Sequence, residues 1–270
     1  MKHIKIFTLT ILLSFTFHSK AQMSRGFASL LPGGGQALNG DYLESFLYFT
    51  ASFGLMSYAK DPKLKTVGLN IYFYNMYDAW RDAGGKPSEQ ETIFSHYGQS
   101  FVPTNIVDPF AISFLTLAAM NRNGARERAI DDAKRDNDQE QLHRWLLTDG
   151  WKSTLTFAAV GMGEEAFFRG FLFPAFSEYL SPWGGAIVSS ALFSFAHVGA
   201  TREENLARFI FGMIFCWQYA SNDYKLGKNI FTHAWYDQIL IGPFSVANSM
   251  NGEKLSLSER PLGIQFLLPF

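Results

Sequence analysis

Long apolar stretches, each broken by very few polar positions, dominate the second half of this 270-residue chain. Four of them follow one another at close spacing: Trp151 to Phe176, Trp183 to Gly199, Leu206 to Ala220 and Ile230 to Ala247. Each approaches the roughly 17 to 25 residues that a helix needs to cross the hydrocarbon of a bilayer. The pattern predicts an all-α fold, a polytopic membrane helical bundle with a four-helix core.

The first half of the chain contains two further apolar stretches. They run from Tyr42 to Ala59 and from Phe101 to Met120. Pro103 and Pro109 in the second stretch predict that its beginning is irregular or kinked. Between the two, the aromatic-rich segment Leu69 to Trp80 is typical of an interfacial helix.

The chain divides into three predicted parts. Residues 1–22 combine two lysines, an apolar stretch and a small-x-small sequence ending at Ala21, which fits a signal peptide; a retained signal anchor is the alternative. Residues 23–145 hold the N-terminal membrane and interfacial helices and a charged loop. Residues 146–270 hold the four-helix core. The polar block from Asn121 to Arg144 marks the boundary and predicts a solvated helix, and its Lys and Arg content predicts a cytoplasmic position.

Composition narrows the choice of partners. The chain has 27 Phe, 11 Tyr and 6 Trp, and they gather in runs without charge, as on a surface that faces lipid. The net charge is −1, and no basic stripe interleaved with aromatics is present, which argues against a nucleic-acid partner. Cys216 is the single cysteine, so an intramolecular disulfide is excluded. A lipid bilayer is therefore the expected environment. The chain is expected to be a multi-pass protein of a bacterial inner membrane.

Charged residues inside the first of the four segments indicate function. Burying a charge in a membrane helix costs at least about 2.5 kcal/mol, so such residues are functional candidates. Glu165 and Arg169 are four residues apart and can pair on one helical face, which leaves Glu164 free to face elsewhere. A structural Glu–Arg pair that only joins two helices is the alternative.

The second and fourth segments add imidazoles and a carboxylate. His197 ends the second segment, and His233 with Asp237 places an imidazole and a carboxylate on one helical face of the fourth. Burying these groups separately would be expensive, so all of them are expected to converge on one site.

Three short patterns stand in order on consecutive apolar segments: Glu164-Glu165-x-x-x-Arg169, Phe193-x-x-x-His197 and His233-x-x-x-Asp237. They resemble the three motifs of the CPBP intramembrane metalloprotease family, also called the Abi or type II CAAX prenyl endopeptidase family. The resemblance covers about residues 151–247. It implies an all-α membrane fold with a four-helix catalytic core that hydrolyses a peptide bond of a membrane-associated peptide or protein.

The resemblance also implies roles within this catalytic set. Glu164 and His197 would activate the attacking water, and Arg169 would orient the glutamate. His233 and Asp237 would support the carbonyl oxygen or a metal. Many family members have Asn at the position of Asp237; an ionised Asp only accepts hydrogen bonds, so it must orient His233, be protonated or bind a metal.

Two forms of the chemistry stay open. Zinc accepts imidazole and carboxylate ligands, so Glu164, His197, His233 and Asp237 are a candidate zinc set. A metal-free glutamate base is equally reasonable, and the sequence has no HExxH motif. The family's prenylated substrates belong to eukaryotic relatives and are not assumed for this chain.

Two alternatives belong to other classes of function. One is a catalytically silent membrane scaffold or immunity-type protein, and the other is a proton-coupled transporter in which Glu and His relay protons. The spacing also raises a conflict: His197 lies near the end of its segment and His233 near the start of another that runs in the same direction. At about 1.5 Å per residue, simple spans would hold them at different depths.

Overall fold

The computed structural model describes residues 21–86, 91–136, 150–197 and 201–240. Every element of these residues is a helix, which confirms the predicted all-α class. The helices of the first half are α2 (Ala21–Ala28), α3 (Gly34–Asn39), α4 (Tyr42–Tyr58), α5 (Pro62–Asp82), α6 (Ile93–Gln99), the 3₁₀ helix η1 (Pro103–Val107) and α7 (Pro109–Asp136). Those of the second half are α9 (Gly150–Glu164), the π-helix η2 (Glu165–Leu172), α10 (Phe173–Ser177), α11 (Pro182–Ala196), α12 (Arg202–Ser221) and α13 (Gly227–Leu240).

Membrane crossing has no direct support from the helices themselves. Within the part of the chain that the structure describes, none of them combines the length and the apolar character that a membrane span requires. The multi-pass arrangement stays a prediction. The predicted signal segment lies almost wholly outside the described residues. The part of the polar block that follows Asp136 lies outside them as well.

The predicted apolar segments correspond closely to observed helices. The stretch from Tyr42 becomes α4, and the proline-containing stretch from Phe101 begins with η1 before α7 starts at Pro109, as the two prolines predict. The segment Trp151 to Phe176 becomes three consecutive pieces, α9, η2 and α10. The fourth segment begins three residues earlier than predicted, at Gly227, and its described part ends at Leu240.

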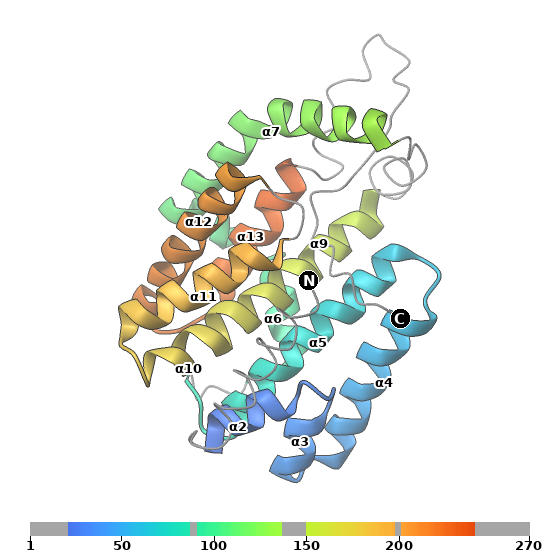
Figure 1. The fold of residues 1–270 in the computed structure, drawn as a ribbon, viewed down its shortest axis with the longest axis vertical. Coiled ribbons are helices and arrows are strands. Elements are labelled where there is room, and N and C mark those ends of the chain that lie inside the picture. The colour runs from blue at the N-terminus through green and yellow to red at the C-terminus, as the bar shows by residue number, and fades with distance from the viewer. Residues whose placement is uncertain (1–20, 87–90, 137–149, 198–200, 241–270) are drawn as a thin grey trace.

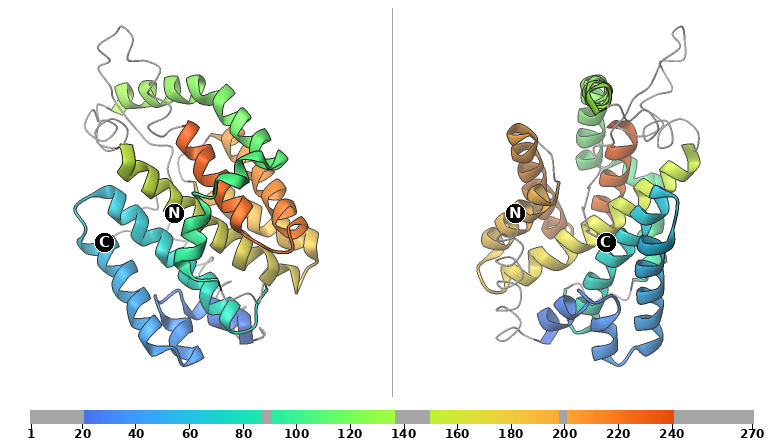
Figure 2. Two further views of the ribbon diagram at one scale, coloured as in Figure 1. Left: turned by 180° about the vertical axis from the view of Figure 1, so that it is seen from behind. Right: turned by 45° about the vertical axis from the view of Figure 1, so that its right-hand side comes forward.

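The helices pack as two flanks with α9 and α13 between them (Figures 1 and 2). The pair α11 and α12 lies on one flank and the pair α4 and α5 on the other, while α9 runs between them and contacts both α5 and α13. Aromatic side chains fill the space where α5 meets η2. The Phe73 and Phe167 rings stack at 4.9 Å, and Phe168 and Phe171 are almost fully buried.

Two glycines allow α9 to approach its neighbours closely. A Cβ atom on Gly161 would stand 2.9 Å from backbone atoms of Ile230 and Ala234, and one on Gly163 would stand 2.5 Å from the Asn70 carbonyl oxygen. Real Cβ contacts are not that short, so larger residues would push α9 away from α13 and α5. The glycines therefore fix the depth at which the next residue, Glu164, faces α13.

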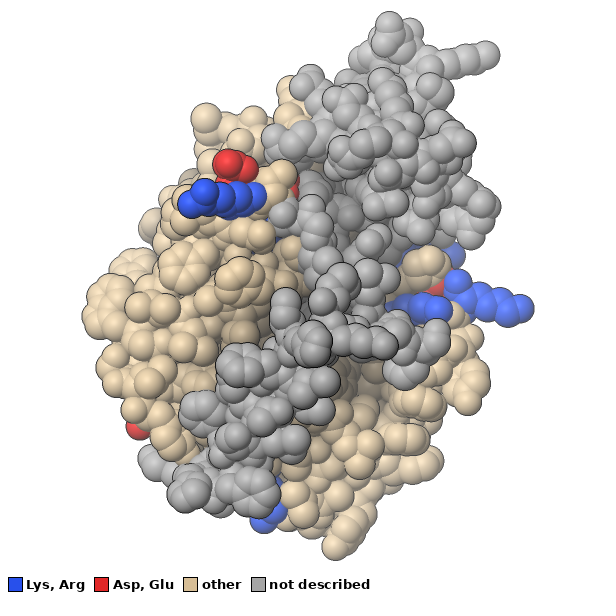
Figure 3. Space-filling model, in the orientation of Figure 1, with Lys and Arg blue, Asp and Glu red and all other residues tan. Residues whose placement is uncertain are grey.

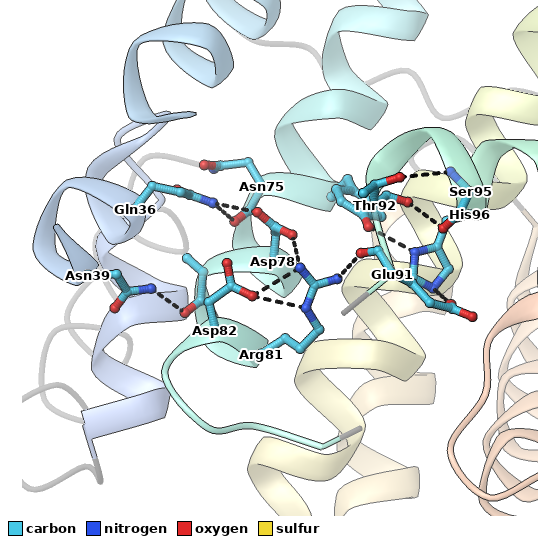
Figure 4. Close-up of polar contacts among 12 residues, drawn as sticks. Gln36, Asn39, Asn75, Asp78, Arg81, Asp82, Glu91, Thr92, Ser95 and His96 are labelled. Carbon is cyan, nitrogen blue, oxygen red and sulfur yellow. Dashed lines mark hydrogen bonds and ion pairs between the residues drawn. The ribbon is translucent and has the colours of Figure 1, made fainter. Parts of the chain in front are cut away.

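A buried polar network fixes α3 against α5 (Figure 4). We call Gln36, Asn75, Asp78, Arg81 and Asp82 the Asp78 cluster. The Gln36 amide donates to the Asn75 carbonyl oxygen at 3.0 Å and to Asp78 at 3.3 Å, and the Arg81 guanidinium binds both Asp78 and Asp82. Gly33, at φ +80, donates its backbone N–H to Asn75. The cluster thus joins α3 to α5 through buried hydrogen bonds.

Candidate active site

Glu165 lies where α9 passes into the π-helix, and its side chain is fully buried. Its Oε1 accepts hydrogen bonds from Arg169 Nη1 at 2.9 Å and from His233 Nδ1 at 2.7 Å, while Oε2 accepts from Asn229 Nδ2 at 3.2 Å. We call Glu165, Arg169, Asn229 and His233 the Glu165 cluster. The predicted pairing of Glu165 with Arg169 is present, and the carboxylate binds α13 as well.

His233 is oriented by this carboxylate. A carboxylate accepts hydrogen bonds, so Nδ1 carries the proton and Nε2 points to the other side of the ring. On that side stand Glu164 Oε2 at 3.7 Å and Asp237 Oδ2 at 3.6 Å. Both separations are too long for a direct hydrogen bond and short enough for strong electrostatic interaction.

Glu164 differs sharply from its neighbour in the chain. Its side chain is buried, yet Oε2 has no hydrogen-bond partner among the described residues. A buried carboxylate oxygen without a partner is expensive, because desolvation is not repaid. Glu164 therefore has a carboxylate oxygen beside His233 that can accept a hydrogen bond from another molecule.

His197 caps the end of α11. Its Nδ1 lies 2.8 Å from the Phe193 carbonyl oxygen, which can only accept, so Nδ1 carries the proton and Nε2 keeps its lone pair. The Phe193 ring contacts His197 edge-on at 4.8 Å and His233 at 6.1 Å. One aromatic side chain thus joins the two histidines.

Arg169 is held from three sides. Besides its bond to Glu165, its guanidinium carbon lies 4.3 Å from the Phe193 ring centroid and 5.1 Å from that of Phe215. Cation–π contacts of this kind hold a buried guanidinium in place. The phenylalanine of the pattern F-x-x-x-H therefore has a physical role, which is to support Arg169 and both imidazoles.

A comparison with protein families agrees with the resemblance drawn from the three motifs. A family model described as "Type II CAAX prenyl endopeptidase Rce1-like" matches residues 147–239, which include all six predicted site residues. Over these residues the chain is similar to the Rce1-like family. The family is a peptidase family associated with membranes, so the resemblance drawn from the three motifs is confirmed. No curated protein and no solved structure matches the chain.

Within the Rce1-like segment, two assignments drawn from the resemblance change. Arg169 binds Glu165 and not Glu164, so its direct effect is on the glutamate that holds His233. Asp237 lies beside Nε2 of His233 and not beside Nδ1, the position that Glu165 occupies. Orientation of His233 is thus the work of Glu165, and Asp237 lies on the open side of the ring together with Glu164.

The conflict over depth is resolved by the limits of the helices. His197 follows the last residue of α11, whereas α13 begins at Gly227, so His233 lies well inside its helix and not at the start. The ring of Phe193 lies against both imidazoles. The start predicted for the fourth segment was three residues too late.

The sequence did not point to Asn229 or Ser189. Asn229 precedes His233 by four residues on α13, a spacing that would have placed it on the same face. Ser189 Oγ donates to the Phe168 carbonyl oxygen at 2.6 Å and so supports the π-helix that follows Glu165. Neither contact follows from spacing alone, since the partners are 64 and 21 residues away.

The candidate zinc set is not gathered into a ligand shell. In the described residues, the group whose carboxylate or imidazole donors all lie within 4.8 Å of one another is Asp41, Glu44 and Asp82, at the exposed end of the α4–α5 pair. Glu164, His197, His233 and Asp237 do not supply three donors that close. Zinc binding by these four residues stays a prediction.

Proposed function

We propose that this chain is a membrane-embedded endopeptidase that hydrolyses a peptide bond of a membrane-associated peptide or protein, with Glu164 as the general base. The observation that carries the proposal is the buried Oε2 of Glu164, which has no hydrogen-bond partner among the described residues and lies near His233 Nε2, whereas both oxygens of Glu165 already accept hydrogen bonds. A base needs an open lone pair within reach of the proton it removes. The Oε2 atom of Glu164 has no competing donor, unlike either oxygen of Glu165.

The reaction follows from these positions. Glu164 takes one proton from water, and the water oxygen forms a bond to the substrate carbonyl carbon, whose oxygen becomes an oxyanion. The C–N bond then breaks, and the proton held by Glu164 passes to the leaving nitrogen. The products are a carboxylate and an amine. His197 Nε2, which keeps its lone pair, helps to hold the water.

The proposal takes the metal-free form of the chemistry, in which Glu164 itself removes the proton. A bound zinc ion would instead supply a water of lowered pKa, and Glu164, His233 and Asp237 are the residues that would hold it. For the metal-free form we expect turnover to persist after dialysis against 1,10-phenanthroline. Loss of activity that returns on adding Zn²⁺ would replace the glutamate mechanism with a metal-based one.

Lipid contact is supported by apolar side chains on the outside of several helices. Phe46 on α4, Trp183 and Phe195 on α11 and Trp217 on α12 are all more than 60% exposed. Figure 3 shows few charged side chains over the described part of the face it presents. Many exposed large apolar side chains with few charges among them are expected on a surface that faces lipid. We expect the full chain to stay in the membrane pellet after extraction with alkaline carbonate.

The test is cleavage by the purified full chain in nanodiscs. The probe is a pooled library of quenched fluorescent peptides that carry an N-terminal myristoyl anchor. We expect Glu164→Gln to lower turnover by about 10³-fold or more, as for loss of a general base. Glu203→Gln, which changes an exposed carboxylate on α12, is the matched control and should leave turnover unchanged.

Two results would contradict the proposal. Absence of any cleaved peptide with the wild type would favour a silent scaffold. Proton flux in liposomes that Glu164→Gln abolishes, without peptide cleavage, would favour a transporter.

A further inference from the structure

One face of α12 lines the site from a side that the three motifs do not include. Arg208, Phe211 and Phe215 are spaced three and four residues apart, so they share a face of the helix. The Phe215 ring lies 6.0 Å from the His233 ring, and the Phe211 ring lies 5.7 Å from that of Tyr236, the residue before Asp237. Arg208 continues this face by one turn toward the start of α12.

Contacts with α11 and a capping box hold the first turns of α12, which include Arg208, in position. Ser194 Oγ donates to the Asn205 carbonyl oxygen at 2.7 Å, which ties the beginning of α12 to α11 three residues before His197. Thr201 and Glu204 form a reciprocal capping box at the start of the helix. Arg208 interacts electrostatically with Asp237, Glu164 and His197. Its guanidinium therefore belongs to the charge distribution of the site.

The guanidinium of Arg208 has a donor without a hydrogen-bond partner among the described residues. Its Nη1 is enclosed but makes no hydrogen bond with any part of the chain that the structure describes. The nearest carboxylate oxygen, Glu204 Oε2, is 4.0 Å away and already accepts the Thr201 backbone N–H at 3.0 Å. Arg169 also has an unpartnered Nε among the described residues, but its guanidinium is already bonded to Glu165 and enclosed by two aromatic rings. Arg208 is thus the guanidinium that can bind something else.

The reaction needs such a donor. The oxyanion formed at the substrate carbonyl is stabilised by hydrogen-bond donors that are in place beforehand. His233 Nδ1 is used by Glu165, and an ionised Asp237 can only accept. We propose that Arg208 donates a hydrogen bond to the oxygen of the scissile carbonyl and carries the developing negative charge; this rests on the proposed function of the site. No proton is transferred by Arg208 in this role.

The experiment measures kcat and KM of the full chain in nanodiscs with the library peptide that the wild type cleaves fastest. We expect Arg208→Gln to lower kcat by about 100-fold, as for loss of one oxyanion donor, and to change KM by less than about threefold. Arg202→Gln, at the exposed start of the same helix, is the matched control and should leave both constants unchanged. Thermal unfolding midpoints show whether each variant is folded.

A double variant separates this role from a structural one. The substitution Asp237→Asn supplies an amide donor beside the same oxygen, so adding it to Arg208→Gln should raise kcat about tenfold above that of Arg208→Gln alone, and both are compared with the single Asp237→Asn variant. Additive losses would overturn the proposal, as would an Arg208→Gln variant that changes only KM. Those results leave Glu164→Gln inactive, whereas failure of the proposed function would appear as cleavage that Glu164→Gln does not affect.

Discussion

The Asp78 cluster and the site around Glu165 contain the same kinds of buried polar groups. They differ in how many of those groups have hydrogen-bond partners. Each has a buried carboxylate paired with an arginine on its own helix, three residues apart in one and four in the other. In the Asp78 cluster, no buried side-chain atom of Gln36, Asn75, Asp78 or Arg81 lacks a partner. Around Glu165, unpartnered atoms are found on Glu164, Arg169, Asn229 and Arg208.

We interpret this difference as one between a network that only stabilises the fold and a network that is prepared to bind a substrate. A saturated polar network stabilises one arrangement of helices, and each bond it contains is lost if a member is removed. A network with open acceptors and donors keeps a desolvation cost that folding does not recover. Such a cost is expected where a substrate will complete the missing bonds. The following predictions test whether satisfaction of polar groups divides the two regions in this way.

The largest loss of stability is expected for Asp78→Ala. This substitution leaves the Arg81 guanidinium without its buried partner, which costs about 3 to 5 kcal/mol of the free energy of unfolding. Asp82→Ala is the control, because Asp82 also binds Arg81 but its side chain is 30% exposed, so the loss should stay below about 1 kcal/mol. Denaturant titration in detergent micelles measures both. Equal losses would show that burial of the Asp78–Arg81 pair does not contribute to stability.

An intermediate and mixed effect is expected for Glu165→Gln. The neutral amide keeps the shape but no longer balances Arg169, so stability should fall by about 2 kcal/mol. His233 loses the acceptor that fixes its orientation, so kcat should fall by about 100-fold as well. Stability and kcat are measured on the same preparation. A variant that loses one without the other would contradict the view that Glu165 both joins α9 to α13 and positions His233.

Glu164→Gln should separate activity from stability. Because Oε2 has no partner among the described residues, removing the charge relieves desolvation, and the free energy of unfolding should stay the same or rise by about 1 kcal/mol. Turnover should be lost at the same time. Denaturant titration of this variant beside Glu165→Gln measures the contrast. A clear loss of stability would mean that Glu164 belongs to a structural network after all.

The smallest effect is expected for Phe193→Leu. The leucine removes the ring that lies 4.3 Å from the Arg169 guanidinium, at a cost of about 1 kcal/mol. Phe195→Leu, two residues further along and 74% exposed, should cost less than about 0.5 kcal/mol. The ratio of the two losses, measured by the same titration, reports the support that α11 gives to Arg169. Equal losses would assign no special role to Phe193.

The fold was predictable where runs of apolar residues are long. The class, the starts of α4, α9 and α11 and the irregular start of the Phe101 stretch follow from periodicity, proline positions and length. The π-helix was not predictable, because nothing local in the sequence separates it from an α-helix. It depends on contacts such as that of Ser189 with the Phe168 carbonyl oxygen, which exist only after α11 has packed.

Charge inside apolar segments predicted the members of the candidate site, Glu164, Glu165, Arg169, His197, His233 and Asp237, and their catalytic role stays a prediction. The contacts among them were mostly not predictable. Spacing also paired Glu165 with Arg169 correctly. It could not show that Glu165 reaches His233, 68 residues later, or that Asp237 faces the opposite side of that ring. Those facts depend on the angle between α9 and α13, which tertiary packing decides.

The π-helix makes the spacing of residues in this segment as important as their identity. Phe173 donates its backbone N–H to Phe168, five residues back, so the turn holds one residue more than an α-helix would. This wide turn takes up its extra residue without the rotation of about 100° that one more residue adds in a regular α-helix, so the helices on either side keep the faces that they present to their neighbours. A further inserted residue has no such turn to take it up, so it would rotate α9 relative to α10 and turn Glu164 away from α13. Single-residue insertions in this stretch should therefore be more harmful than single-residue deletions.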